Sequence, residues 1–299
     1  MKKLLLVIML FGYLQAIDLG SIATASKTGT YYKLGKDIST ILSEYNIKLT
    51  AINTEGSFEN LSILDGHDVK HKKTFFAIVQ KDALSYYNYT LRGSGEKRIY
   101  EKLPVILSLG TEQIHIFTSK NNNFNLEMKN NFKVYCGDSE GGSCISAQYI
   151  EKAYGYKFTY IKSNKLTAKE KVKNGSIDLY ISVTQAPASK FEIIKDLKLL
   201  KLPKNSIMDT MYTKKTIDSN TYNWIESDIE IYSVPKVLIT SLYQEKYDVV
   251  IDSIVKVILL NKDKLEENYP IRWSNMNFKY MHYKNFSKIS KKLIDKTFY

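Results

Sequence analysis

Short turns rich in glycine, serine and threonine connect apolar strand patterns to helical patterns in both halves of the chain. In the first half, Gly20 to Ala25 (GSIATA) reads as a strand, and a helical pattern begins near Thr30. In the second half, the strand 132–135 and the helix 145–153 flank the turn GDSEGGS at 137–143. Strands that alternate with helices at this spacing predict βαβ units and a mainly parallel sheet. The sequence therefore predicts an α/β fold.

The same alternation divides the chain into two lobes. A long β-rich stretch, 104–118, is expected to pass from one lobe to the other. The other predicted strands are 48–53, 74–79, 158–162, 177–183 and 237–240, and the other predicted helices are 168–174 and 247–260. The predicted boundaries are a signal peptide at 1–16, the first part of lobe 1 at 17–117, lobe 2 at 118–235, and a C-terminal helical part at 236–299 that returns to lobe 1.

The N-terminus has the pattern of a secretory signal. Lys2 and Lys3 precede the apolar run Leu4 to Leu14, and Ala16 follows as a small residue suited to cleavage. An uncleaved membrane anchor would need about 20 apolar residues, and Asp18 ends this run early. We therefore expect a periplasmic protein that has no transmembrane segment after cleavage.

Two cysteines, Cys136 and Cys144, lie on either side of the second-lobe turn. In an oxidising compartment such a pair can form a disulfide, and the alternative is two buried thiols. Two cysteines without a neighbouring histidine do not make a zinc site. His67 and His71 have helical spacing, but their segment is polar and lysine-rich, as in a solvated loop. No metal site is expected.

The charge excludes some classes of partner and the motifs exclude most enzymes. The chain has 43 basic and 31 acidic residues, a formal charge of +12, yet its only arginines are Arg92, Arg98 and Arg272. Lysine gives a point charge rather than the planar fork that suits base and phosphate recognition, so no nucleic-acid partner is expected. The HExxH, CxxC, P-loop and GxGxxG motifs are absent. We expect no catalysis and no cofactor.

The turns themselves favour binding of a small anion. In open α/β sheets, ligands bind beyond the carboxyl ends of the strands, near helix N-termini. Backbone N–H groups and the helix dipole attract carboxylate or phosphate there. Two lobes that each offer one such turn would enclose a solute between them. The structural alternative is that the hydroxyls only cap helices and the turns are ordinary strand-to-helix connections.

Five segments carry a resemblance to a known family. They are Ile22 to Gly35, Thr54 to Leu61, Phe76 to Ala83, Gly137 to Ile150 and Ser176 to Ser189. In order and spacing they are similar to the TAXI family, the extracytoplasmic solute receptors of tripartite ATP-independent periplasmic (TRAP) transporters. The resemblance covers roughly residues 20–270. It implies a two-lobed type II periplasmic-binding-protein fold, a TRAP-type membrane permease as partner, and glutamate, glutamine or a related dicarboxylate as solute.

The turns and the resemblance together give the candidate ligand-binding residues. In lobe 1 they are Thr24, Ser26, Thr28, Gly29, Thr30, Tyr31, Tyr32, Ser57, Asn60, Gln80, Asp82 and Glu112, and in lobe 2 they are Ser139, Gly141, Gly142, Ser143, Thr184 and Gln185. With few arginines, a bound carboxylate is expected to contact mainly backbone N–H groups, hydroxyls and a lysine, and a clamp by Arg92 or Arg272 would contradict this expectation.

Two other functions stay open at the level of the sequence. An exported interaction protein could keep this fold without transport, with Ala25, Cys144 and Thr184-Gln185 as departures from the family pattern. A receptor for a neutral amino acid or an aromatic compound is also compatible with a chain that has 23 tyrosines.

Overall fold

The computed structural model describes residues 16–68, 70–91, 102–121, 126, 130–139, 141–192, 194, 196–278, 281–282, 286, 290–291 and 294. The predicted signal peptide, apart from Ala16, lies outside these residues, as do Arg92 and Arg98. No helix in the described ranges is long and apolar enough to cross a membrane.

Strands and helices alternate through both halves, as the sequence predicts. The elements are β1 (Ile17–Ala23), α1 (Thr30–Ser43), β2 (Ile47–Ile52), α2 (Ser57–Leu64), β3 (Thr74–Gln80), α3 (Lys81–Leu91), β4 (Val105–Ser119), β5 (Asn131–Tyr135), α5 (Gly142–Tyr154), β6 (Lys157–Tyr160), α6 (Lys165–Lys173), β7 (Leu179–Thr184), η2 (Ser189–Phe191), β8 (Leu197–Leu199), α7 (Ser206–Met211), β9 (Thr213–Ile217), β10 (Ile229–Thr240), η3 (Glu245–Tyr247), α8 (Asp248–Leu260), α9 (Lys262–Asn268), α10 (Pro270–Trp273) and β11 (Met276–Asn277).

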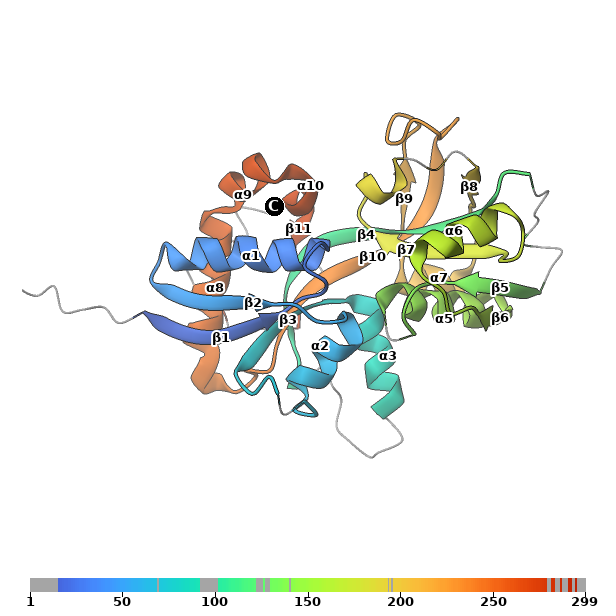
Figure 1. The fold of residues 1–299 in the computed structure, drawn as a ribbon. Helices are drawn as coiled ribbons and strands as arrows, with labels where there is room; N and C mark the ends of the chain where they lie inside the picture. The colour runs from blue at the N-terminus through green and yellow to red at the C-terminus, as the bar shows by residue number, and fades with distance from the viewer. Residues whose placement is uncertain are drawn as a thin grey trace, which may run out of the picture.

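The described strands form one curled sheet with two parallel portions. Its main order is β2-β1-β3-β10-β4-β7-β5-β6. β1 runs parallel to β2 and β3, and β5 runs parallel to β6 and β7. Between these portions, β10 pairs antiparallel with β3 and β4, and β4 pairs antiparallel with β7. Each parallel portion, with its helices, is one lobe of a two-lobed α/β fold (Figure 1).

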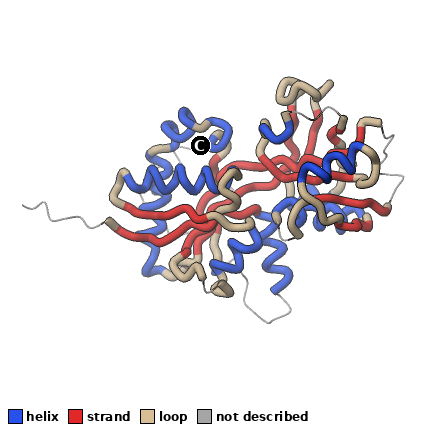
Figure 2. Tube along the Cα trace, in the orientation of Figure 1, coloured by secondary structure: helices blue, strands red, loops and turns tan. Residues whose placement is uncertain are grey.

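Two long strands connect the lobes (Figure 2). β10 pairs with β9 at one end and with β3 at the other, and β4 pairs with β7 and β10 in the same way. The predicted boundaries at 117/118 and 235/236 fall inside these strands. After β10, α8 packs beside α1, and β11 pairs with β4. The chain thus returns to the first lobe at its C-terminal end, next to the first helix (Figure 1).

Several predicted boundaries differ from the structure for identifiable reasons. The first strand ends at Ala23, and Thr24 donates its hydroxyl to the Ile52 carbonyl at 2.6 Å. α5 starts at Gly142 rather than 145, because its first residues are small and give no apolar period. β10 starts at Ile229 rather than 237, since Pro235 and its polar neighbours hide a strand that pairs with β9 and β4.

The core of the first lobe forms where α1 and α8 pack together on the sheet. Leu34, Ile38 and Leu42 of α1 are fully buried, beside Ile251 and Ile258 of α8. Burial of a side chain of this size contributes about 2 kcal/mol. The helical period that predicted α1 is therefore the face that holds it against the sheet, and this packing fixes where its N-terminus points.

A disulfide joins Cys136, after β5, to Cys144 in the first turn of α5. Their Cα atoms are 4.9 Å apart. The bridge closes the turn that leads into α5. The two-thiol alternative is not what the structure shows.

The histidine pair of the first lobe has ordinary partners. His71 Nδ1 lies 2.9 Å from Asp68 Oδ2, and His67 Nε2 lies 3.3 Å from Asp65 Oδ2. Within the described residues, no group of three His, Cys, Asp or Glu side chains could hold a metal ion.

Candidate functional site

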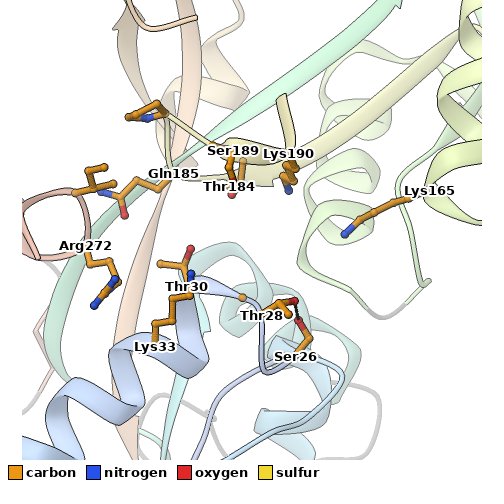
Figure 3. A pocket seen from close by; sticks show the side chains of 14 residues that line it. Ser26, Thr28, Thr30, Lys33, Lys165, Thr184, Gln185, Ser189, Lys190 and Arg272 are labelled. Carbon is orange, nitrogen blue, oxygen red and sulfur yellow. Dashed lines mark hydrogen bonds between the residues drawn. The ribbon is translucent and has the colours of Figure 1, made fainter. Parts of the chain in front are cut away.

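A cavity of about 450 Å³ lies between the two lobes. The N-terminus of α1 and part of α10 form its first-lobe side, and the start of α6 and the segment after β7 form its second-lobe side (Figure 3). Its lining residues are Ser26, Thr28, Gly29, Thr30, Lys33, Lys165, Thr184, Gln185, Pro187, Ala188, Ser189, Lys190, Ile271 and Arg272.

The N-terminus of α1 opens into this cavity. Gly29 is the N-cap residue and no side chain caps the helix, so N–H groups of the first turn lack an intrahelical acceptor. The Ser26 and Thr28 hydroxyls lie 3.5 Å apart beside it, and the Gly29 N–H donates to the Ser26 carbonyl at 2.8 Å. Exposed N–H groups and the positive end of the helix dipole form a binding place for an anion.

Cations from both lobes surround the cavity. Lys33 and Arg272 come from the first lobe, and Lys165 and Lys190 come from the second (Figure 3). Lys190 Nζ donates to Ser182 Oγ at 2.9 Å and lies 5.0 Å from the centre of the Phe191 ring. Burial, with repulsion from nearby lysines, lowers the pKa of Lys190 to about 8. An anion bound here would contact positive charge on both sides.

Arg272 is positioned by a buried carboxylate. Its Nε donates to Asp37 Oδ2 at 2.9 Å and its Nη2 to Oδ1 at 3.3 Å. The Trp273 indole N–H donates to the same Oδ2 at 3.0 Å. The Arg272 guanidinium also lies over the Tyr269 ring, 4.3 Å from its centre. These contacts hold α10 against α1 and fix the arginine at the edge of the cavity.

A buried polar network lies behind Gln185. Lys236, which is fully buried, donates from Nζ to Gln185 Oε1 at 2.6 Å. The Tyr31 hydroxyl donates to Glu112 Oε2 at 2.7 Å. Burial lowers the pKa of Lys236 to about 8, while the Glu112 charge opposes this shift. Burial raises the pKa of Glu112, and the Lys236 charge opposes that shift in turn. The network sets the orientation of the Gln185 amide at the cavity.

Asp82 connects the lobes by hydrogen bonds. Its Oδ2 accepts from Ser146 Oγ at 2.5 Å and from the Tyr212 hydroxyl at 2.9 Å, and both donors belong to the second lobe. Its Oδ1 accepts from the Ala83 N–H at 2.8 Å. Burial raises the pKa of Asp82 to about 6, although the hydroxyl donors oppose the shift. The carboxyl therefore acts as an inter-lobe contact.

Gln80 presses against the start of α5. A Cβ built on Gly142 would lie 1.6 Å from Gln80 Oε1, so the side-chain amide of Gln80 lies directly against the Gly142 backbone. Gln80 is buried, and its Oε1 has no hydrogen-bond partner. Gly142 is thus required for this contact between β3 of one lobe and α5 of the other.

Replacing Gly142 with alanine is expected to lower the free energy of unfolding by about 1 kcal/mol, because the added methyl group displaces the buried Gln80 amide. In the double variant Gly142→Ala with Gln80→Ala, the clash disappears and the two substitutions should be clearly non-additive. Urea denaturation of the four proteins of this cycle measures the coupling. Additive effects would mean that the two residues do not meet.

Six of the eighteen predicted ligand-binding residues line the cavity. They belong to the turn at the start of α1 and to the C-terminal end of β7 with the residue that follows it. They are Ser26, Thr28, Gly29, Thr30, Thr184 and Gln185. The others do not line it. They are Thr24, Tyr31, Tyr32, Ser57, Asn60, Gln80, Asp82, Glu112, Ser139, Gly141, Gly142 and Ser143.

Several of these side chains have structural partners. Asn60 donates to the Thr24 and Ile78 carbonyls at 2.6 and 2.9 Å, and it accepts from Thr54. Ser57 Oγ accepts from the Gln80 N–H at 3.1 Å, and Ser143 Oγ accepts from the Val183 N–H at 2.9 Å. Ser57, Asn60 and Ser143 therefore have structural partners although no side chain caps α2 or α5, and their contact with a ligand stays a prediction.

Local sequence patterns do not identify the cations of the cavity. Lys33 lies one helical turn after Thr30, so the predicted α1 could have placed it beside the turn. Arg272 was named only as a residue that would contradict the expected mode of binding. Lys165 and Lys190 stand among many lysines, and no local pattern sets them apart.

Solved structures of periplasmic solute-binding proteins have a similar fold. A putative periplasmic sulfonate-binding protein of Methylobacillus flagellatus matches with a TM-score of 0.53 and 11% identity, over 94% of this chain and 78% of that one. The periplasmic aliphatic sulphonate binding protein of Escherichia coli matches with 0.51 and 11%, over the same shares. The periplasmic binding protein BugD matches with 0.51 and 11%, over 93% of this chain and 94% of that one.

At such identities the similarity concerns the fold, which is the two-lobed α/β fold of periplasmic solute-binding proteins. No curated protein matches the chain. A family model does match, over residues 22–285, which include every element of both lobes except the start of β1. On this match over most of its length, the chain belongs to the NMT1-like family.

Proposed function

We propose that this protein is the periplasmic solute receptor of a TRAP-type transport system, close to the TAXI group, and that it presents a small anionic solute to a membrane permease. The NMT1-like family, the fold of the solute-binding neighbours and the resemblance of the turns support this proposal. The same neighbours support the expectation that the chain is not an enzyme. TAXI-like ligands, glutamate, glutamine and related dicarboxylates, are the first solutes to test.

The observation that carries the proposal is the composition of the inter-lobe cavity. The uncapped N-terminus of α1 faces the same space as Lys33, Arg272, Lys165 and Lys190. An anion between them neutralises positive charge from both lobes at once. Charge-assisted hydrogen bonds of this kind are shorter and stronger than neutral ones.

Binding would favour closure of the lobes. β4 and β10 are the strands that pass between them, and bending at these strands is a hinge motion. Closure brings the second-lobe lysines nearer to α1 and excludes water, which strengthens each contact with the anion. A permease that recognises only the closed form would then take up loaded receptors. No covalent step is involved.

The test is a melting experiment with the chain from Ile17 onward and a panel of solutes. The panel contains glutamate, glutamine, 2-oxoglutarate, other dicarboxylates, alkyl sulfonates, neutral amino acids and aromatic acids. A ligand at 1,000 times its Kd stabilises by about 4 kcal/mol, which raises Tm by roughly 8 °C in a chain of this size. We expect such a shift with anions. A flat panel, with no copurified solute in mass spectrometry, would favour the exported interaction protein instead.

A further inference from the structure

We propose that the inter-lobe cavity selects organic anions that carry no ammonium group, so that an oxo acid, hydroxy acid or sulfonate binds and the corresponding amino acid is rejected. This inference rests on the proposed function and narrows its solute class. A preference for anions does not specify which group the ligand carries beside its carboxylate or sulfonate, and the inference concerns that group.

The lining of the cavity carries positive charge. Four of the lining side chains are cationic, and among the described residues none that lines the cavity is acidic. The cations stand on both sides of the cavity, so a small ligand cannot turn its ammonium away from all of them (Figure 3). Like charges a few ångströms apart repel more strongly in a partly buried site than in water.

The carboxylates near the cavity already have partners. Both oxygens of Asp37 accept from Arg272, and one also accepts from the Trp273 indole. Glu112 accepts from Tyr31 and is stabilised by the charge of Lys236. A ligand ammonium would have to break one of these contacts to gain a carboxylate, and breaking a buried ion pair is costly.

The surroundings of Lys190 disfavour positive charge on the second-lobe side of the cavity, and the lowered pKa of this side chain reflects it. Its pKa falls to about 8, first because it is buried and then because Lys165 and Lys169 repel its charge, although the charge of Glu112 opposes this shift. Lys169 Nζ lies 3.0 Å from the Lys190 carbonyl oxygen, so the three lysines are neighbours. An ammonium on a ligand would meet the same burial and the same repulsion.

The remaining acceptors are weak substitutes. The hydroxyls of the lining are neutral, and Gln185 Oε1 already accepts from Lys236 at 2.6 Å. A neutral acceptor recovers only part of the hydration that an ammonium loses on entry. The carboxylate or sulfonate end of the same ligand has, in contrast, the α1 N–H groups and the cations as donors.

The test uses pairs of ligands that differ in the ammonium group. They are 2-oxoglutarate and glutamate, succinate and aspartate, and ethanesulfonate and taurine, each titrated calorimetrically into the chain from Ile17 onward. For every pair that binds, we expect the member without the ammonium to bind at least tenfold more tightly. An amino acid that binds as tightly as its partner would overturn the inference and leave the anion receptor intact. Failure of both members of all pairs would overturn the inference together with the proposed function.

A substitution in the lining checks the electrostatic cause. Ser189→Asp adds a carboxylate to the cavity, and Ser189→Asn is a control of the same size without charge. For a ligand pair, the Kd of the amino compound divided by the Kd of its partner without the ammonium should be at least fivefold smaller in the Asp variant than in the Asn variant. Circular dichroism and melting of both variants show that they fold. An equal preference in the two variants would contradict the electrostatic cause and overturn the inference.

Discussion

Replacing Asp37 with alanine is expected to lower the free energy of unfolding by about 3 kcal/mol. The substitution leaves Arg272 without its carboxylate and the buried Trp273 indole without its acceptor. Since Asp37 belongs to α1 and its partners belong to α10, the variant also loosens the C-terminal segment from the first lobe. Urea denaturation followed by tryptophan fluorescence measures the loss.

Two controls separate this effect from the simple loss of a charge. Asp37→Asn keeps an oxygen acceptor and should lose less than the alanine variant. Asp263→Ala removes an exposed carboxylate from α9 and should stay within about 0.5 kcal/mol of the parent protein. If the Asp37 and Asp263 alanine variants were equally stable, the buried cluster would not be a major support of the first lobe.

Reversing the charge at Lys190 is expected to weaken binding of an anionic solute at least 100-fold, and Lys190→Gln about 30-fold. Removing one partner of a partly buried charge contact typically costs 2–5 kcal/mol, and the glutamate adds repulsion. Calorimetric titration with the best anion of the panel measures the change. Lys173→Gln is the matched control, because Lys173 ends the neighbouring helix α6 and pairs with Asp196, outside the cavity lining. Equal affinities of the Lys190 and Lys173 variants would contradict the role of Lys190.

The pH dependence of binding provides a separate prediction for the same residue. The pKa of Lys190 is lowered to about 8, so the side chain is charged below pH 8 and neutral above it. Anion affinity should therefore be full near pH 7 and fall as the pH rises through about 8. The pKa of Lys236 is lowered to about 8 as well, so the Lys190→Gln variant decides between them. A variant that keeps the full pH dependence would assign the titration to Lys236.

Much of the fold follows from local patterns. The period of Leu34, Ile38 and Leu42 predicts α1 because those side chains are the ones that pack on the sheet. β10 was predicted too short because its first half is a strand only by virtue of pairing with β9 and β4, with Pro235 inside it. Local patterns detect a strand that buries an apolar face, and they miss one that depends on its neighbours.

The candidate site was predictable only in part. Ser26, Thr28 and Thr30 are marked by a glycine between hydroxyl residues just before a helix, and they line the cavity, as do Thr184 and Gln185; their contact with a ligand stays a prediction. Arg272 is held beside them by its ion pair with Asp37, which lies 235 positions earlier in the chain. No local sequence pattern predicts such a contact. Gln80, at the end of β3, and Gly142, at the start of α5, show the converse case, since both were predicted to bind a ligand and in this structure they contact each other.

The return of the chain to the first lobe has a consequence for the order in which the protein can fold during synthesis. β3 can pair with β1 early but gains its other neighbour only when β10 is made, and β4 gains β11 later still. β5, β6 and β7, in contrast, are neighbours in sequence and can pair as soon as they leave the ribosome. Domains generally fold as units while the chain grows. The half of the molecule that is made first is therefore the half that is completed last.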